Sequence, residues 1–310
     1  MRILAAVVLL VFAGCQEKRT SVFVDPALLS LVPADSTIIG GIRMEKLKNA
    51  AVYQKYATTP QIQSTLERIA KNLGIDPRKD IWEILIASNG KDRSLVMARG
   101  SFAGMGLEPS IEKEGVKRIA YKSYMMFGTE EAAVVFMNSS TAIGGKTEHL
   151  RQLIDSRDTN PPAPKAFLGK LATIPKDSEI WAISLTGLPF GPSELATDTS
   201  DLARNLAANL PRLLGSLESS TVAVNLKDGV HAVIDASCPT EKDGKILHDT
   251  LRGLLGLARL NLPENNRDML KLLDEVQVVQ NLTKVKLEMN FTMNDIGAVL
   301  EILPGRIAVP

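Results

Sequence analysis

The chain has 310 residues, which is enough for about two domains of ordinary size. Its 36 basic and 35 acidic side chains nearly cancel, and this balance argues against a nucleic-acid partner, because such a protein needs a basic face. Hydrophobic residues make up 45% and charged residues 23%, as in a soluble globular protein, whereas aromatic residues are scarce at 5%. The core is therefore expected to consist mainly of aliphatic side chains and Met.

The N-terminus has the pattern of a secretory signal. Arg2 supplies a positive charge, residues 3–13 are all apolar, and a charged stretch follows Cys15. The apolar run is too short to span a membrane, which takes about 20 residues. Residues 11–15 read Val-Phe-Ala-Gly-Cys and resemble the lipobox of bacterial lipoproteins, although Phe12 stands where that family usually has Leu.

The resemblance implies a lipoprotein of the cell envelope. In that family the thiol of the cysteine, here Cys15, receives a diacylglycerol, the signal (residues 1–14) is removed, and the new amine is usually acylated with a palmitate-type chain. Two or more acyl chains hold a protein stably on a bilayer. Gln16 is not aspartate, which in enteric-type bacteria implies the outer rather than the inner membrane. Residues 15–24 would then be a lipidated tether, and the body would lie on the periplasmic side.

Two stretches of the remaining chain resemble each other and predict an internal repeat. Asp25–Ile42 and Lys165–Ile183 each read as a short apolar helix, then Pro-x-Asp-Ser, then a strand. The two prolines of this pattern, Pro33 and Pro175, lie 142 residues apart. The pattern also resembles uncharacterised exported bacterial proteins, a resemblance that implies no activity.

The first repeat, residues 25–158, continues with helical and strand patterns. Apolar residues recur at helical spacing over 61–73, and Asn89-Gly90 indicates a hairpin. The further predicted elements are strands over 81–88, 94–102, 116–126 and 132–139 and a helix over 147–156. Residues 144–147, Gly-Gly-Lys-Thr, lack the glycine at position 140 that a phosphate-binding loop needs, so we interpret them as a turn with Thr147 as helix N-cap.

A proline-rich linker, residues 159–164, precedes the second repeat, residues 165–310. The predicted elements there are a helix over 201–217 kinked at Pro211, strands over 221–226 and 230–237 joined at Asp228-Gly229, a helical region over 243–276 broken near Pro263, a strand over 284–291 and a helix over 294–303. The fold class is therefore α+β, with two tandem repeats that each carry a mostly antiparallel sheet and helices packed on one face. Whether the two sheets join is left open.

Two apolar stretches are candidate contact sites. Phe190 lies in an apolar loop, residues 187–192, and would contact a partner or the membrane unless it tucks back onto its own domain. The leucine-rich stretch 246–262 predicts a helix with one apolar stripe, and Leu257 and Leu260 fall outside it. An apolar arc this wide predicts either deep burial or a groove for a partner or a lipid-like ligand.

The sequence holds no recognised catalytic or metal-binding motif. His149, His231 and His248 stand at no metal-ligand spacing, and no nucleophile elbow is present. Cys238 is the one cysteine besides Cys15, so we expect no intramolecular disulfide and interpret Cys238 as a small buried hydrophobe. No cofactor, metal or catalytic residue is expected.

We therefore expect a lipid-anchored envelope protein with a non-catalytic binding or assembly role, whose partners are the membrane and another envelope protein. One alternative is a carrier or sensor of lipid-like ligands that uses the helix over 246–262, which an apolar tunnel under that helix would favour. The second alternative is a hydrolase assembled from distant residues. A cleft that gathers a histidine with carboxylates would favour it.

Overall fold

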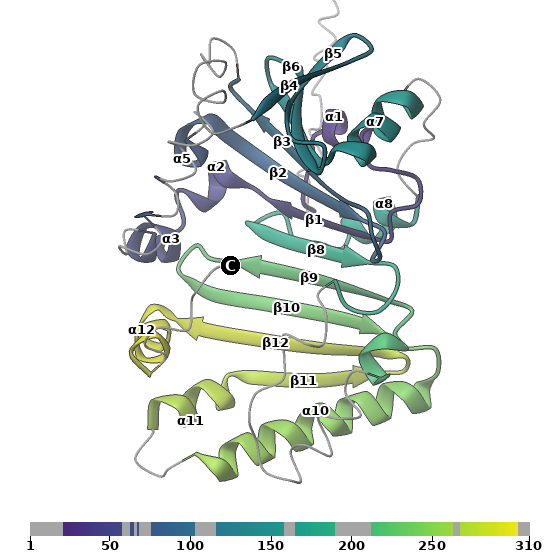
Figure 1. Cartoon of the computed structure of the whole chain (residues 1–310). Coiled ribbons are helices and arrows are strands. Elements are labelled where there is room, and N and C mark those ends of the chain that lie inside the picture. The colour runs from purple at the N-terminus through teal and green to yellow at the C-terminus, as the bar shows by residue number, and fades with distance from the viewer. Residues whose placement is uncertain are drawn as a thin grey trace, which may run out of the picture.

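A computed structural model describes residues 21–57, 63–64, 67, 76–102, 116–157, 165–189, 212–262 and 267–302. Within these residues the fold is α+β: twelve strands form one antiparallel sheet, and helices pack against it (Figure 1). Several predicted segments lie outside the described residues. They are the signal, the proline-rich linker, most of the tether and most of the predicted helices over 61–73 and 201–217. None of the described helices is both long and apolar enough to cross a membrane.

The part of the chain before residue 158 supplies strands β1 to β7. They are β1 (Ile38–Ile42), β2 (Ile81–Ser88), β3 (Ser94–Gly100), β4 (Lys117–Tyr121), β5 (Tyr124–Gly128), β6 (Ala132–Asn138) and β7 (Thr141–Lys146). Its described helices are α1 (Pro26–Leu29), α2 (Met44–Leu47), α3 (Ala51–Tyr56), α5 (Pro77–Asp80) and α7 (Thr147–Ser156). The strand over 81–88 and the helix over 147–156 are confirmed with their predicted bounds.

The part after residue 164 supplies strands β8 to β12. They are β8 (Ile180–Ser184), β9 (Ser219–Asn225), β10 (Gly229–Ser237), β11 (Val276–Asn281) and β12 (Lys284–Thr292). Its described helices are α8 (Lys165–Leu171), α10 (Glu241–Asn261), α11 (Arg267–Asp274) and α12 (Met293–Ile302). Thr240 caps α10, because its hydroxyl accepts the backbone N–H of Asp243 at 3.1 Å.

The two parts of the chain meet in the middle of one continuous sheet. The strand order is β11-β12-β10-β9-β8-β1-β2-β3-β7-β6-β5-β4, so β1 and β8 join the halves (Figure 1). These two strands run antiparallel, with Gly40 opposite Ala182. In the next pair Gly41 makes room for Trp181, because a Cβ on Gly41 would lie 2.3 Å from the Trp181 ring, which is buried.

In the N-terminal half, helices cover one face of the sheet. Residues paired directly across a ladder point to the same face. Ile39 pairs with Ala87, and Ala87 pairs with Leu95, so all three share a face, and all three are buried. Leu28 of α1 and Phe167 of α8 belong to the same buried cluster. The main core therefore lies between this face and the short helices.

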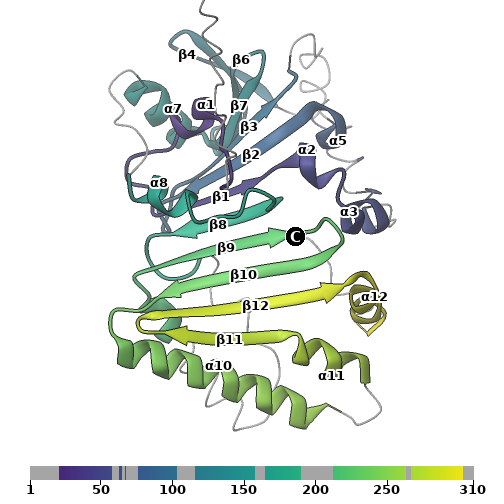
Figure 2. The ribbon, with the colours of Figure 1, turned by 180° about the vertical axis from the view of Figure 1, so that it is seen from behind.

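Strands β8 and β9 still contribute to this main core, but on the outer strands β10 to β12 a second described core lies on the opposite face. Ile183 of β8 pairs with Ile39 on one side and with Thr221 of β9 on the other. Thr221 in turn pairs with Asp235 of β10, so Asp235 lies on the face of Ile39. The neighbouring Ala236 therefore points to the other face. Ala236 packs with Leu247 of α10 in a second, smaller buried cluster. Figures 1 and 2 show α10 running beside β11, at the edge of the sheet.

Three predicted elements are wrong. The single strand over 116–126 is a hairpin, β4 and β5, with a turn in which Lys122 has a φ of 52°. The predicted turn over 144–147 belongs largely to strand β7, which pairs with β3 and β6. The predicted end of the helical region at residue 276 is instead the first residue of strand β11.

Thr147 is also not a helix N-cap. It is the first residue of α7, and its hydroxyl donates a hydrogen bond to the carbonyl of Thr129 at 2.6 Å. Lys146 occupies the cap position without a side-chain hydrogen bond. The helix start is therefore held by the adjoining strand and a contact 18 residues away, which local sequence does not reveal.

Candidate functional site

A cleft of about 270 Å³ lies where β1 ends, β2 begins and β3 ends. We call it the Glu83 cleft. Its lining side chains are three basic groups, three carboxylates and two aromatic rings: Arg43, Lys46, Arg99, Asp25, Glu45, Glu83, Phe23 and Trp82.

The segment that enters the fold from the N-terminus forms one wall of this cleft. Ser21 bridges to Pro175, and the backbone N–H of Val22 donates to the carbonyl of Ile174 at 2.9 Å. Val22 and Val24 are buried in the main core, and alternation along an extended chain then turns Phe23 outward. Phe23 is 47% exposed.

Glu83 is the most perturbed acid of the described residues. It lies on β2 directly opposite Arg99 of β3, and its Oε2 accepts the backbone N–H of Asp25 at 3.3 Å. Its Oε1 is buried and has no hydrogen-bond partner in the described part of the chain. Burial raises the pKa of Glu83 to about 7, the Asp25 carboxylate adds to the rise, and the Asp25 N–H, Arg43 and Arg99 oppose it.

Arg99 ties the cleft to the neighbouring strands. Its Nε lies 2.9 Å from Oδ2 of Asp25, and its Nη1 donates to Ser140 Oγ at 2.7 Å and Thr141 Oγ1 at 3.0 Å. The guanidinium lies 6.0 Å from the centre of the Trp82 ring, within range of a cation–π contact. Arg99 therefore holds the Asp25 wall and the Trp82 wall in place together.

The other two cations converge on the segment before β8. Arg43 donates to the carbonyl of Lys176 and, at 3.5 Å, to that of Ser178. Lys46 Nζ donates to the same Lys176 carbonyl at 2.9 Å and lies 3.7 Å from Asp177. Burial first, and then the charge of Arg43, hold the pKa of Lys46 below its usual value. These contacts join the two halves of the chain at the cleft.

A second, polar cleft of about 610 Å³ adjoins the first and shares Lys46. We call it the His231 cleft. Here His231 Nε2 lies 3.0 Å from Asp228 Oδ1, and Nδ1 lies 3.1 Å from Asn290 Oδ1. The structure thus brings one predicted histidine together with carboxylates, including Glu179. The residues that line this cleft include no Ser, Thr or Cys nucleophile among those described.

The other sequence-predicted candidates do not come together. Cys15 and Phe190 lie outside the described residues. Leu257 is half-buried on α10, and Leu260 on the same helix is 83% exposed. A cleft of about 490 Å³ lies between α10, α11 and β11, and neither leucine lines it. Its walls combine apolar side chains such as Leu255 and Leu273 with Arg252, Arg259 and Asp274, and Arg259 pairs with Asp274.

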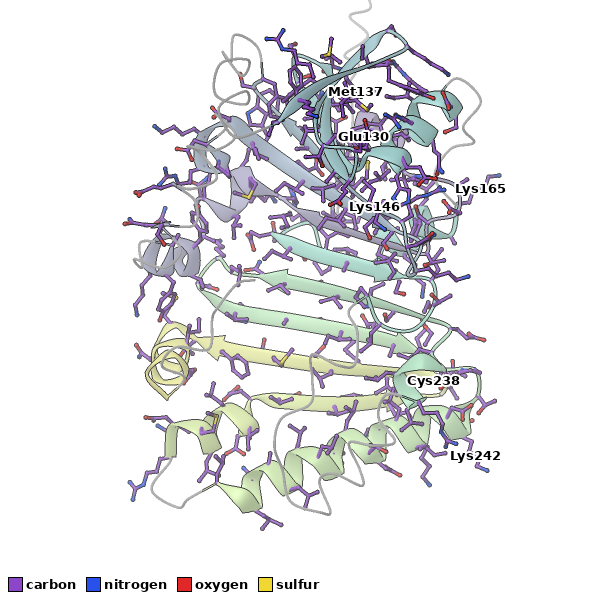
Figure 3. The ribbon with its side chains drawn as sticks, viewed as in Figure 1. Glu130, Met137, Lys146, Lys165, Cys238 and Lys242 are labelled. Atoms are coloured by element: carbon purple, nitrogen blue, oxygen red, sulfur yellow. The ribbon has the colours of Figure 1, made fainter. Side chains whose placement is uncertain are left out.

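The remaining histidines and the cysteine have local surroundings. His149 is buried on α7, and His248 Nδ1 lies 2.9 Å from Asp249. Cys238 is buried beside the start of α10, near Lys242 in Figure 3, and burial raises the pKa of its thiol. Across the described ranges, no group of three or more His, Cys, Asp or Glu side chains is placed to hold a metal ion.

Sequence reasoning did not find the Glu83 cleft, although one signal for it exists. In the strand Ile-Trp-Glu-Ile-Leu-Ile-Ala-Ser, Glu83 falls in phase with Leu85 and Ala87, which face the core. A carboxylate at an inward position of an apolar strand indicates a paired or proton-holding group. Its partners Asp25 and Arg99 lie 58 and 16 positions away along the chain, and nothing in the local sequence identifies them.

Comparisons with known proteins place little constraint on function. No protein-family model and no curated protein matches the chain. Solved structures of TP0453 show a distant similarity to this chain. Crystal form III gives a TM-score of 0.48 at 11% identity over 91% of this chain and 99% of that chain. Crystal form I gives 0.46 at 9% identity over 90% and 98%. Values this low assign neither a family nor a function.

Proposed function

We propose that this chain is a lipid-anchored protein of the cell envelope with a non-catalytic binding or assembly role. The observation that carries the proposal is the docking of residues 21–25 into the main core. Six residue steps separate Cys15 from Ser21, which span at most about 20 Å. A lipid on Cys15 would therefore hold the folded body close to the bilayer, on the periplasmic side and, from Gln16, at the outer membrane.

We prefer binding to catalysis because the charged groups of the Glu83 cleft are tied to each other and to backbone carbonyls. Arg43 and Lys46 share the carbonyl of Lys176, and Arg99 holds Asp25. Side chains held in this way present a fixed pattern of charge to a partner. The exposed Phe23 and Trp82 beside them add apolar area to the same surface.

We further propose that the chain consists of two tandem repeats. Counted outward from the β1–β8 junction, the first five strands are β1-β2-β3-β7-β6 on one side and β8-β9-β10-β12-β11 on the other, so their relative order along the chain is the same, and β5 and β4 extend the first side alone. Gly40 lies opposite Ala182, and these residues are 142 positions apart, as are Pro33 and Pro175. Both agreements support a local two-fold axis through this residue pair.

The anchor is tested by replacing Cys15 with Ala in a bacterium with intact lipoprotein processing. We expect wild-type protein in the membrane fraction and the Cys15→Ala protein in the soluble periplasmic fraction. The matched control is Cys238→Ala, which removes the other thiol and should leave the protein on the membrane. Equal membrane retention of both variants would contradict the proposal.

A second candidate role, as a carrier or sensor of lipid-like ligands, is favoured by the cleft beside α10. Its apolar wall and Arg252 would suit an acyl chain with an acidic end, whereas Arg259 in the same cleft already pairs with Asp274. Delipidated protein should then take up a fluorescent fatty acid, and Leu255→Trp should block that uptake. Uptake that is unchanged in Leu255→Trp would exclude this cleft as the binding site.

A further inference from the structure

We propose that the Glu83 cleft binds the headgroup of a zwitterionic phospholipid that carries a primary ammonium, the phosphatidylethanolamine type. The source of the ligand would be the bilayer that holds the anchor, so this step rests on the proposed function. The class of ligand follows from the cleft's own residues.

The position of the cleft suits a headgroup. Phe23 and Asp25, two of its lining residues, lie two and four positions after Ser21, where the short tether enters the fold. Its volume of about 270 Å³ is just below the roughly 300–1,000 Å³ of pockets that enclose drug-sized ligands. The cleft is therefore of a size for a headgroup, with the acyl chains left in the bilayer.

The balance of charge in the cleft selects a zwitterion. Three basic and three acidic side chains line it. A simple anion would meet the carboxylates, and a simple cation would meet the guanidinium and ammonium groups. A ligand that carries both signs can place its phosphate by Arg43 and Lys46 and its ammonium by Glu83 and Glu45.

The unpaired oxygen of Glu83 selects a primary ammonium over choline. Glu83 Oε1 is buried without a hydrogen-bond partner in the described residues, which is costly for a carboxylate. An ethanolamine ammonium brings N–H donors to this oxygen, whereas a choline has none. The rings of Trp82 and Phe23 offer a neighbouring surface on which a cation is attracted.

The same groups make binding depend on pH. The charges that face Glu83 are Asp25 on the entering segment, Arg43 after β1 and Arg99 on β3. Because the pKa of Glu83 is about 7, this carboxyl takes up a proton as the pH falls below that value. The ion pair with an ammonium is then lost, so binding should weaken between pH 8 and pH 5.5.

The first test uses the whole mature chain with Cys15→Ala and soluble headgroup probes. Glycerophosphoethanolamine, glycerophosphocholine and glycerol phosphate are titrated by calorimetry at pH 8. We expect glycerophosphoethanolamine to bind at least tenfold more tightly than the other two. Equal affinity for all three, or tightest binding of glycerol phosphate, would overturn the proposal.

Variants locate the binding. Glu83→Gln and the exposed Glu45→Gln should each weaken glycerophosphoethanolamine binding, the former about tenfold, because each loses a charge that faces the ammonium. The control is Glu130→Gln, whose side chain is 76% exposed and pairs with Arg151 outside the cleft (Figure 3). Circular dichroism verifies the fold of each variant. Unchanged affinity in both Glu83→Gln and Glu45→Gln would refute the site.

A vesicle experiment tests the membrane source. The Cys15→Ala protein is floated with vesicles of phosphatidylcholine alone, phosphatidylcholine with phosphatidylethanolamine, or phosphatidylcholine with phosphatidylglycerol. We expect flotation to increase with phosphatidylethanolamine and to fall in Glu83→Gln. Flotation that increases only with phosphatidylglycerol would contradict the proposal. None of these measurements requires the anchor, so their failure is distinguishable from a failure of the anchor itself.

Discussion

The two halves of the sheet differ in how they are stabilised. On the N-terminal half and the adjoining strands β8 and β9, the entering segment and α1, α7 and α8 bury one face of the sheet in a large cluster that includes Trp181 of β8. On the outer strands β10 to β12, α10 packs beside the edge of the sheet in a cluster of fewer buried residues around Leu247, on the opposite face. One hydrogen-bonded ladder, β1 with β8, joins them. A single sheet can thus carry two cores that lie on different strands and on opposite faces.

Because of this difference, the main buried core and the solvent-exposed polar side chains occupy different parts of the same sheet face. On the face of Ile39, the C-terminal strands carry polar groups such as His231 and Asp235, which meet solvent as expected for one side of an antiparallel sheet. The polar clefts lie where the halves adjoin, at one end of the junction strands. Val22 and Val24 of the main core lie beside this end, and charged side chains line the clefts there.

The largest expected effect is that of Trp181→Ala. Trp181 is 1% exposed and lies in the main core on a junction strand. Truncation of a buried Trp costs about 3–5 kcal/mol. Chemical denaturation should show this loss as a lowered midpoint. Trp82→Ala, which truncates a Trp that is 37% exposed, should cost clearly less. Equal losses would contradict the central place of the junction in the main core.

Leu247→Ala should come next, at about 2–4 kcal/mol, because it opens a cavity in the smaller core. The matched control on the same helix is Leu260→Ala, which should change stability by less than about 0.5 kcal/mol because Leu260 is 83% exposed. Hydrogen exchange should show loss of protection in β11 and β12 before β2 and β3. Simultaneous loss everywhere would mean that the two cores unfold as one.

Sequence patterns predicted the elements of both halves better than their connection. The strand over 81–88 has apolar residues in alternation, and the helix over 147–156 has an amphipathic period, so each was found with its bounds. β7 was missed because its two glycines lower strand propensity and indicate a turn. β11 was missed because it follows a leucine-rich helix without a clear boundary signal.

The junction and the Glu83 cleft could not be predicted, because both depend on contacts between distant residues. The sequence predicted two similar units, but it left open whether their sheets join. The answer depends on the fit of Gly41 to Trp181, which are 140 positions apart. The raised pKa of Glu83 likewise depends on burial under the segment around Asp25.

A smaller effect should follow from Gly41→Ala, which tests the fit at the junction. The new Cβ would lie 2.3 Å from the ring of Trp181, so the ring has to move. Overpacking of this kind costs about 1–3 kcal/mol. The control is Gly256→Ala on α10, where a Cβ meets nothing within 4 Å and stability should stay level or rise. A neutral Gly41→Ala would mean that the junction is loosely packed.

The smallest effect is a pH dependence that Glu83 contributes. Its folded pKa of about 7 lies above the ordinary value of 4.5, so the folded state holds the proton more firmly. This contribution is complete below about pH 4.5 and is lost as the pH rises through 7. Between pH 5 and pH 8 the wild type should lose about 1–2 kcal/mol more than Glu83→Gln, after allowance for solvent screening. Parallel pH profiles of unfolding would show that Glu83 is not the titrating group.

The most direct test of the account is mass spectrometry of the mature N-terminal peptide from protein isolated out of native membranes. The account predicts that the peptide begins at Cys15 and carries a diacylglycerol on the thiol and an acyl chain on the amine. A peptide that begins elsewhere, or a free thiol at Cys15, would remove the bilayer from beside the Glu83 cleft and contradict the central claim.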